Sequence, residues 1–153
     1  MNNYTSDTPF VCAHMYHIQE NSSSCHNDCR FLTVLKGKII LTLRGRKYLL
    51  EKDNIFYIPC SCSYELEALA SSILLYICFH PLFLLDSIGF DYKYIWYNSE
   101  DQHADTAHAF HQQIAALAAI SLQDSKQNIF LIHSRAYALL DTISKSCLNK
   151  PDD

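Results

Sequence analysis

Six short apolar runs follow one another from His26 to Phe79, and turn residues separate them at close intervals. Their length and their content of Ile, Leu, Tyr, Phe and Thr are typical of strands. The turns, Lys36-Gly37 among them, leave no room for crossover helices, so the sequence predicts a largely antiparallel sheet. The runs are CRFLTVL, KIILTLR, KYLLE, NIFYIP, SYELEALA and SILLYICF. A sheet of this kind closes into a small barrel or sandwich whose interior can hold one small ligand.

Weaker signals flank this block. Phe10–Ile18 can form a first strand, and either of its two alternating sets of side chains can face inward. Residues 19–27 are polar and serine-rich, which predicts a loop. Pro81 ends the block, because proline cannot continue a central ladder, and residues 91–98 can form one more strand.

From Ser99 onward the apolar period changes from two to about 3.6, the period of an amphipathic helix. Ser99 and Gln102 fit a capping box at the start of a helix over residues 100–123. A second helix is predicted over residues 127–148, and the short turn between the two predicts an antiparallel hairpin. The expected fold class is α+β, mainly β, with a barrel over residues 1–98 and a helical hairpin over residues 99–150.

Composition restricts the classes of function. The net charge of −4 and the pI near 6.0 argue against a chain that grips a phosphate backbone by itself. No apolar run approaches the length that spans a bilayer, so no membrane partner is expected. The odd count of seven cysteines and the polar start of the chain favour reduced thiols and a cytoplasmic protein.

The strand block carries two partial motifs. Arg30, six further residues and Gly37 reproduce the spacing of the first cupin motif, and Lys52-Asp53, NIFYIP and Cys60 resemble the second. Roughly residues 20–148 resemble the sensor domain of AraC-type transcription regulators. The resemblance lies in the segment VLKGKIILTLRGRKYLLEKDNIFYIP and in FHP before a helical hairpin. This resemblance implies a cupin-like antiparallel β-barrel (a double-stranded β-helix) followed by a C-terminal antiparallel helical hairpin.

The metal ligands of cupins are mostly replaced. By resemblance their positions fall on Ser24, His26, Arg30 and Ser63, or on Tyr64 if the register slips by one residue. One histidine cannot hold zinc or iron, and the cation at position 30 would repel a divalent ion. We therefore predict no metal, no cofactor and no catalytic residues. The alternative is a stand-alone cupin metalloenzyme with a non-standard metal site.

Cysteines offer a second possible metal set. Cys25, Cys29, Cys60 and Cys62 can meet His26 at one mouth of the barrel, where a thiolate zinc site is conceivable. The competing interpretation is that they are ordinary small, partly buried residues. The sequence favours the second interpretation, because Cys60-x-Cys62 lacks the usual spacing.

The lining of the pocket follows from strand alternation. If Arg30 points inward, then His26, Asp28, Leu32, Val34 and Lys36 share its face, as do Ser63, Glu65 and Glu67 on a later strand and Leu74, Tyr76 and Cys78 on the last. In the sugar-sensing members a basic residue before the turn glycine and an aromatic residue on the last strand contact the ligand, which implies such roles for Lys36 and Tyr76. The predicted ligand-binding residues are His26, Arg30, Lys36, Ser63, Glu65 and Tyr76. The competing interpretations are a turn residue for Lys36, an Arg30–Glu65 pair and a core role for Tyr76.

We therefore expect the effector-binding and dimerisation domain of an AraC-type regulator. Its ligand is expected to be a small molecule, and the resemblance to sugar-sensing members makes a sugar a candidate. DNA contact is expected only through a C-terminal helix-turn-helix domain absent from this chain, which ends at Pro151-Asp152-Asp153 and resembles a piece of a longer protein. A homodimer is expected through the second helix, where apolar residues recur every three or four positions. The predicted dimerisation residues are Ile132, Ala136, Leu139, Leu140 and Ile143. The competing interpretation is a monomer in which the barrel covers this stripe.

Overall fold

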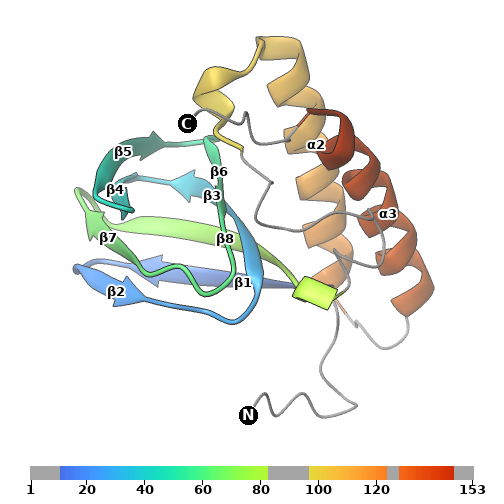
Figure 1. Cartoon of the computed structure of the whole chain (residues 1–153), viewed down its shortest axis with the longest axis horizontal. Helices are drawn as coiled ribbons and strands as arrows, with labels where there is room; N and C mark the ends of the chain where they lie inside the picture. Colours follow the sequence, from blue (N-terminus) through green and yellow to red (C-terminus); the bar gives the residue numbers. More distant parts are fainter. Residues whose placement is uncertain (1–10, 83–96, 124–127, 147–153) are drawn as a thin grey trace.

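In the part of the chain that the structure describes, eight strands form two four-stranded antiparallel sheets that face each other (Figure 1). The computed structural model describes residues 11–82, 97–123 and 128–146. The sheets have the strand orders β1-β8-β3-β6 and β2-β7-β4-β5. The strands are β1 (Val11–Ile18), β2 (Ser22–Ser24), β3 (Cys29–Lys36), β4 (Lys38–Leu43), β5 (Arg46–Glu51), β6 (Ile55–Ile58), β7 (Tyr64–Ala68) and β8 (Ser72–Phe79). This is the order of a double Greek-key jelly roll, the architecture of cupins, and it confirms the predicted fold class.

Two long helices cover one side of the barrel (Figure 1). A short 3-10 helix, η2 (Ser99–Asp101), precedes α2 (Ala104–Ser121) and α3 (Ile129–Ser146). The predicted capping box at Ser99 is wrong. The Asn98 side chain caps η2, the Ser99 hydroxyl accepts a hydrogen bond from the Ile55 amide at 2.9 Å, and α2 begins only at Ala104.

The first sheet has an apolar core on each of its faces. Strand alternation sends Phe31 and Ile77 outward to the helices, where Phe110 of α2 closes the layer. The intervening residues, such as Leu32 and Leu74, point into the barrel and meet the second sheet. Each such side chain contributes about 1.5–3 kcal/mol on burial, so the two cores fix which face of β3 and β8 is available to a ligand.

A tight turn joins β3 to β4 and breaks the alternation just before it. The pairing of β3 with β8 shifts between Val34 and Lys36, so Lys36 is exposed rather than turned into the barrel as predicted. Gly37 follows with φ +91°, and a Cβ there would lie 2.2 Å from the Ser72 hydroxyl oxygen. That hydroxyl accepts a hydrogen bond from the Lys38 amide at 3.1 Å, so only glycine fits this turn.

Other boundaries differ from the sequence predictions. The expected loop over residues 19–27 contains β2, which pairs with β7. The strand expected over 91–98 lies outside the described residues except for Tyr97 and Asn98, and Asn98 forms a bridge with Phe56. Among the described helices, none has the length and apolar character needed to cross a membrane.

The helical hairpin packs on its own chain with the residues that were predicted to form the dimer. Ile132, Ala136, Leu139 and Leu140 are 0–4% exposed and belong to the core between the helices and the first sheet. These four side chains have no surface left for a second copy, so their assignment to the dimer contact is corrected. The side chain of Ile143 lies outside the described part of the chain.

Candidate ligand-binding site

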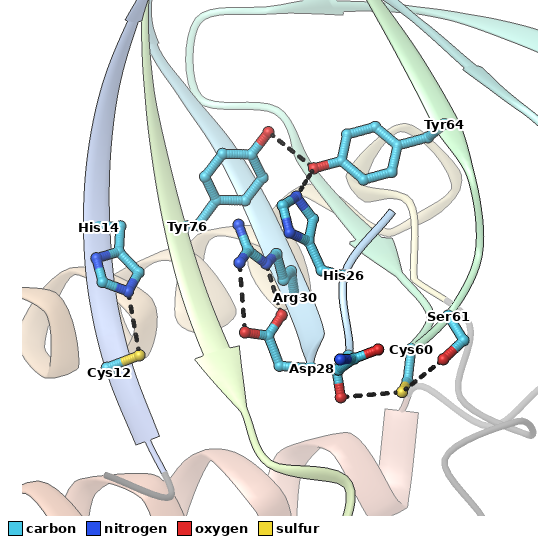
Figure 2. A network of polar contacts seen from close by, with 10 residues as sticks. Cys12, His14, His26, Asp28, Arg30, Cys60, Ser61, Tyr64 and Tyr76 are labelled. Carbon is cyan, nitrogen blue, oxygen red and sulfur yellow. Dashed lines mark hydrogen bonds and ion pairs between the residues drawn. The ribbon is translucent and has the colours of Figure 1, made fainter. Parts of the chain in front are cut away.

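A polar network lies inside the barrel at the end where β3 begins (Figure 2). His26 precedes β3, Tyr64 opens β7 and Tyr76 lies on β8, so three separate segments contribute. The Nε2 atom of His26 lies 2.8 Å from the Tyr64 hydroxyl, which in turn donates a long, weak hydrogen bond of 3.5 Å to the Tyr76 hydroxyl. The network thus links both sheets across the barrel.

Arg30 is the charged centre of this network. Its Nε donates to Asp28 Oδ1 at 2.6 Å and its Nη2 to Asp28 Oδ2 at 3.3 Å, a two-point contact. The guanidinium carbon lies 5.1 Å from the ring centroid of Tyr76. Arg30 is only 7% exposed, and its Nη1 has no hydrogen-bond partner among the described residues. A buried donor of this kind is costly to leave unsatisfied and is a natural contact for a ligand oxygen.

Burial sets the protonation states of the network. Burial, and secondly the Arg30 charge, lowers the pKa of His26, so its imidazole is neutral at pH 7. Burial likewise raises the pKa values of Tyr64 and Tyr76, so both phenols keep their protons. Burial alone would lower the pKa of Arg30, but the hydrogen bond to Asp28 raises it and keeps the guanidinium charged. At neutral pH the site therefore presents one ion pair and several neutral hydrogen-bonding groups.

The structure separates the predicted ligand-binding residues into two groups. His26, Arg30 and Tyr76 come together in the network. Lys36, Ser63 and Glu65 are exposed outside it. The predicted inward orientation of Ser63, Glu65 and Glu67 is wrong, because Tyr64 and Leu66 are the inward residues of β7. A one-residue slip of register exchanges the two faces of a strand, and it places Tyr64 where Ser63 was expected.

Ser63 and Glu65 line a different feature. With Ser23, Thr42 and Arg44 they border an open groove of about 660 Å³ beside the β4–β5 turn. Apart from Tyr64, the groove includes no residue of the polar network. Exposed side chains such as Glu65 remain solvated and leave no unsatisfied buried group, so we take the network as the candidate site.

The sequence analysis missed the contribution of β1. Tyr16 forms a T-shaped contact with Tyr76, with 5.4 Å between ring centroids. On the same face of β1, Cys12 Sγ lies 3.4 Å from His14 Nε2 (Figure 2). One alternating set of the first strand contains all three β1 residues, but the local pattern did not decide between the two sets. Cys12 pairs with Cys78 of β8. The two residues are far apart in the sequence, so no local motif predicts this pairing.

The cysteines that were weighed as a second metal set do not come together. Cys29 faces the helical core, where burial raises the pKa of its thiol to about 12. Cys60 donates to the Asn27 carbonyl at 3.1 Å, and Cys25 is exposed. Within the described ranges, three metal-ligating side chains converge only at Cys12, His14 and Cys78.

The metal centre that cupins carry does not fit the residues at the family's positions. His26 is the one ligand of the usual type there, and it is hydrogen-bonded to Tyr64. Arg30 brings a positive charge to the centre of the site, and Ser24 supplies only a hydroxyl.

Solved structures of low sequence identity are similar to part of this chain. No protein-family model matches the chain, and no curated protein matches its sequence. The putative ethanolamine utilization protein Q of Salmonella typhimurium LT2 is 18% identical with a TM-score of 0.44, over 46% of this chain and 58% of that one. KdgF from Halomonas sp. is 19% identical with a TM-score of 0.44, over 48% and 72%. An RmlC-like cupin from Shewanella frigidimarina NCIMB 400 is 14% identical with a TM-score of 0.43, over 46% and 66%.

The fold of this chain is cupin-like. That statement rests on the strand order of its two sheets, and the solved structures named above do not extend it to an activity. The chain spans a little over half the length of the Salmonella protein, so nothing in that protein's name is transferred to it.

Proposed function

We propose that this chain is the effector-binding module of an AraC-type transcription regulator and that it binds a small, oxygen-rich molecule at the polar network. The observation that carries the proposal is the buried Arg30 Nη1, which has no partner among the described residues. The resemblance of the strand block to AraC-type sensor domains supports the regulatory role. We propose binding rather than catalysis as the role of the network.

The chemistry of the network favours a sugar or a sugar acid. Arg30 can donate to a carboxylate or hydroxyl oxygen, while the neutral phenols of Tyr64 and Tyr76 can both donate and accept. The ring of Tyr76, in T-shaped contact with Tyr16, is the aromatic group of the network that can meet an apolar patch on the ligand. Glu65 and Lys36, which lie outside the network, are not part of this proposed contact set.

A route from ligand to helices runs through β1. Tyr16, on the inner face of β1, contacts Tyr76. Val11 and Ala13, on the outer face of the same strand, pack in the core with α2 and α3. A ligand that moves Tyr16 therefore acts on the strand that supports the hairpin. We propose that this shift changes how the hairpin presents an attached DNA-binding domain and a second copy of the chain.

Calorimetric titration of the chain with neutral pentoses and hexoses and with the matching uronic acids tests the proposal. We expect one member of the panel to bind, and Arg30→Gln to weaken its binding at least about tenfold, since a hydrogen bond to a charged donor contributes about 1.5–3 kcal/mol. Arg46→Gln, at an exposed position of β5, is the matched control and should leave the affinity unchanged. Equal affinity in parent and Arg30→Gln, or no binding across the panel, would contradict the proposal.

A further inference from the structure

Two thiols and an imidazole converge on adjacent strands at the edge of the barrel interior. Cys12 of β1 and Cys78 of β8 are directly opposite in the antiparallel ladder, so their side chains project to the same face. His14 follows two residues after Cys12 and shares that face. The two sulfur atoms and a ring nitrogen all lie within 4.8 Å of one another.

We infer that Cys12, His14 and Cys78 form a binding site for one thiophilic metal ion, with Zn²⁺ as the expected occupant. Two thiolates and one imidazole are a zinc ligand set that leaves the fourth tetrahedral position open. These residues are separate from the positions at which cupins hold their metal, and the inference does not depend on the proposed effector.

The spacing of the ligand atoms agrees with this assignment. Bond lengths of about 2.3 Å to sulfur and 2.0–2.1 Å to nitrogen place two ligands of a tetrahedral zinc ion about 3.5–3.8 Å apart. Cys12 Sγ and His14 Nε2 are 3.4 Å apart, close to that edge (Figure 2). All three ligand atoms lie within 4.8 Å of one another. Small rotations about side-chain bonds would bring them to tetrahedral spacing.

Accessibility also fits a site that can load from solvent. His14 is exposed, Cys12 is half-buried and Cys78 is buried. The ion would therefore enter from the His14 side and end against the deepest ligand. The open fourth position would face the exposed side, where water or a small ligand can complete the coordination.

Charge does not oppose a cation here, although Arg30 lies on the neighbouring strand opposite Cys78. The carboxylate of Asp28, in a two-point contact with the guanidinium, offsets its positive charge. Two thiolates and Zn²⁺ form a centre in which their charges cancel, so a metal-loaded site adds no net charge beside Arg30. The cupin metal positions around Arg30 include no thiolate that would balance the charge of Zn²⁺. The two locations therefore differ in their suitability for a cation.

Cobalt substitution is the direct test. Chelator-treated protein under a thiol-free reductant is titrated with Co²⁺ and then with Zn²⁺. We expect one Co²⁺ per chain, a thiolate-to-cobalt charge-transfer band, visible bands of tetrahedral intensity, and displacement of the cobalt by one equivalent of Zn²⁺. Absence of the charge-transfer band, or octahedral visible bands alone, would overturn the inference.

Variants assign the ligands. His14→Gln changes an exposed side chain and should leave the fold intact, while Zn²⁺ affinity falls by more than the roughly 10–100-fold that loss of an outer-shell partner produces. Cys12→Ser removes one of the two thiolates and should lower the charge-transfer intensity per bound cobalt to about half. The matched controls are His17→Gln, at an exposed histidine of the same strand, and Cys62→Ser, at a thiol as half-buried as Cys12. Loss of the spectrum in a control variant, or its retention at full intensity in both His14→Gln and Cys12→Ser, would overturn the assignment.

Discussion

Arg30 lies over the ring of Tyr76 while its other edge is held by Asp28, so an aromatic face and a carboxylate together fix one guanidinium. The stacking and the two-point salt bridge leave Nη1 as the nitrogen that can still donate a hydrogen bond to a ligand. The arrangement presents a charged donor in a fixed direction before any ligand arrives. Such preorganisation favours binding, because little side-chain freedom remains to be lost.

The Arg30–Asp28 pair should also stabilise the fold. Arg30→Ala leaves the Asp28 carboxylate, which is 28% exposed at its side chain, without its partner. We expect a loss of about 1–3 kcal/mol in the free energy of unfolding, less than for a fully buried pair because water still reaches Asp28. Urea unfolding of the parent, Arg30→Ala, Asp28→Asn and the double variant gives a double-mutant cycle. A coupling energy near zero would show that the pair does not contribute.

The hydroxyl of Tyr64 connects His26 to Tyr76, so removing it affects two contacts at once. Tyr64→Phe should lower the free energy of unfolding by about 1 kcal/mol and weaken effector binding, because His26 Nε2 loses its partner. Tyr48→Phe, a half-buried tyrosine on β5, serves as a comparison outside the network. An effect on binding as large in Tyr48→Phe as in Tyr64→Phe would contradict the specific role of the network.

Stability should depend on pH through His26. Burial, and secondly Arg30, lowers the pKa of His26 in the folded state below its unfolded value of about 6.5. The folded state therefore favours the neutral ring. Its contribution to stability is complete above the unfolded pKa and is lost as pH falls through the lowered folded pKa.

Thermal unfolding between pH 7.5 and 5 checks this sign. We expect the melting temperature of the parent to fall over this interval more steeply than that of His26→Gln. The exposed His17, replaced by Gln, is the control and should retain the parent's slope. Parallel curves for the parent and His26→Gln would contradict the assignment.

Two turn glycines offer a matched pair for the backbone. Gly37 and Gly45 both have positive φ, but a Cβ at Gly37 would clash with Ser72 whereas nothing lies within 4 Å at Gly45. We expect Gly37→Ala to lower the free energy of unfolding by about 2–5 kcal/mol, from backbone strain and overpacking together. Gly45→Ala should lower it by about 1–2 kcal/mol, from backbone strain alone. Denaturant unfolding that gives equal losses would disprove the close approach at Ser72.

Much of the barrel could be predicted because its signals are local. Run length, period and turn residues are readable within a few positions. The inward orientation of Arg30, assumed from its resemblance to the cupin motif, agrees with its position over the inward-facing Tyr76. The helices were predicted from their apolar faces for the same reason. The start of α2 was less accurate, because the Ser99 hydroxyl is used by Ile55 of a distant strand rather than by its own helix.

The part of the site that could not be predicted depends on register and long-range pairing. The shift between Val34 and Lys36 moves Lys36 off the inner face, and the start of β7 at Tyr64 turns Glu65 outward. Neither displacement leaves a mark in the local pattern, and each exchanges faces by a single residue. The pairing of Cys12 with Cys78 likewise joins two strands from opposite ends of the barrel sequence.

The last prediction concerns self-association, for which the structure changes the residues to be tested. Leu140 lies at the centre of the seam suggested by the sequence, but it is 1% exposed and belongs to the internal core. A charged residue at position 140 should therefore unfold the chain, and it cannot report on a dimer. Phe130 and Tyr137 are 87% and 53% exposed, and their separation of seven residues places them on the same face of α3.

We expect the chain to form a two-fold dimer through this face of α3, since exposed aromatic side chains of this size gain most from burial in a contact. Phe130→Glu combined with Tyr137→Glu should give a monomer whose circular dichroism and melting curve match those of the parent. Leu49→Glu, at an exposed leucine on the opposite side of the barrel, is the control and should remain dimeric. Sedimentation velocity measures all three. A parent that sediments as a monomer at high micromolar concentration would exclude this contact. A dimer that is absent at that concentration is also absent at lower ones.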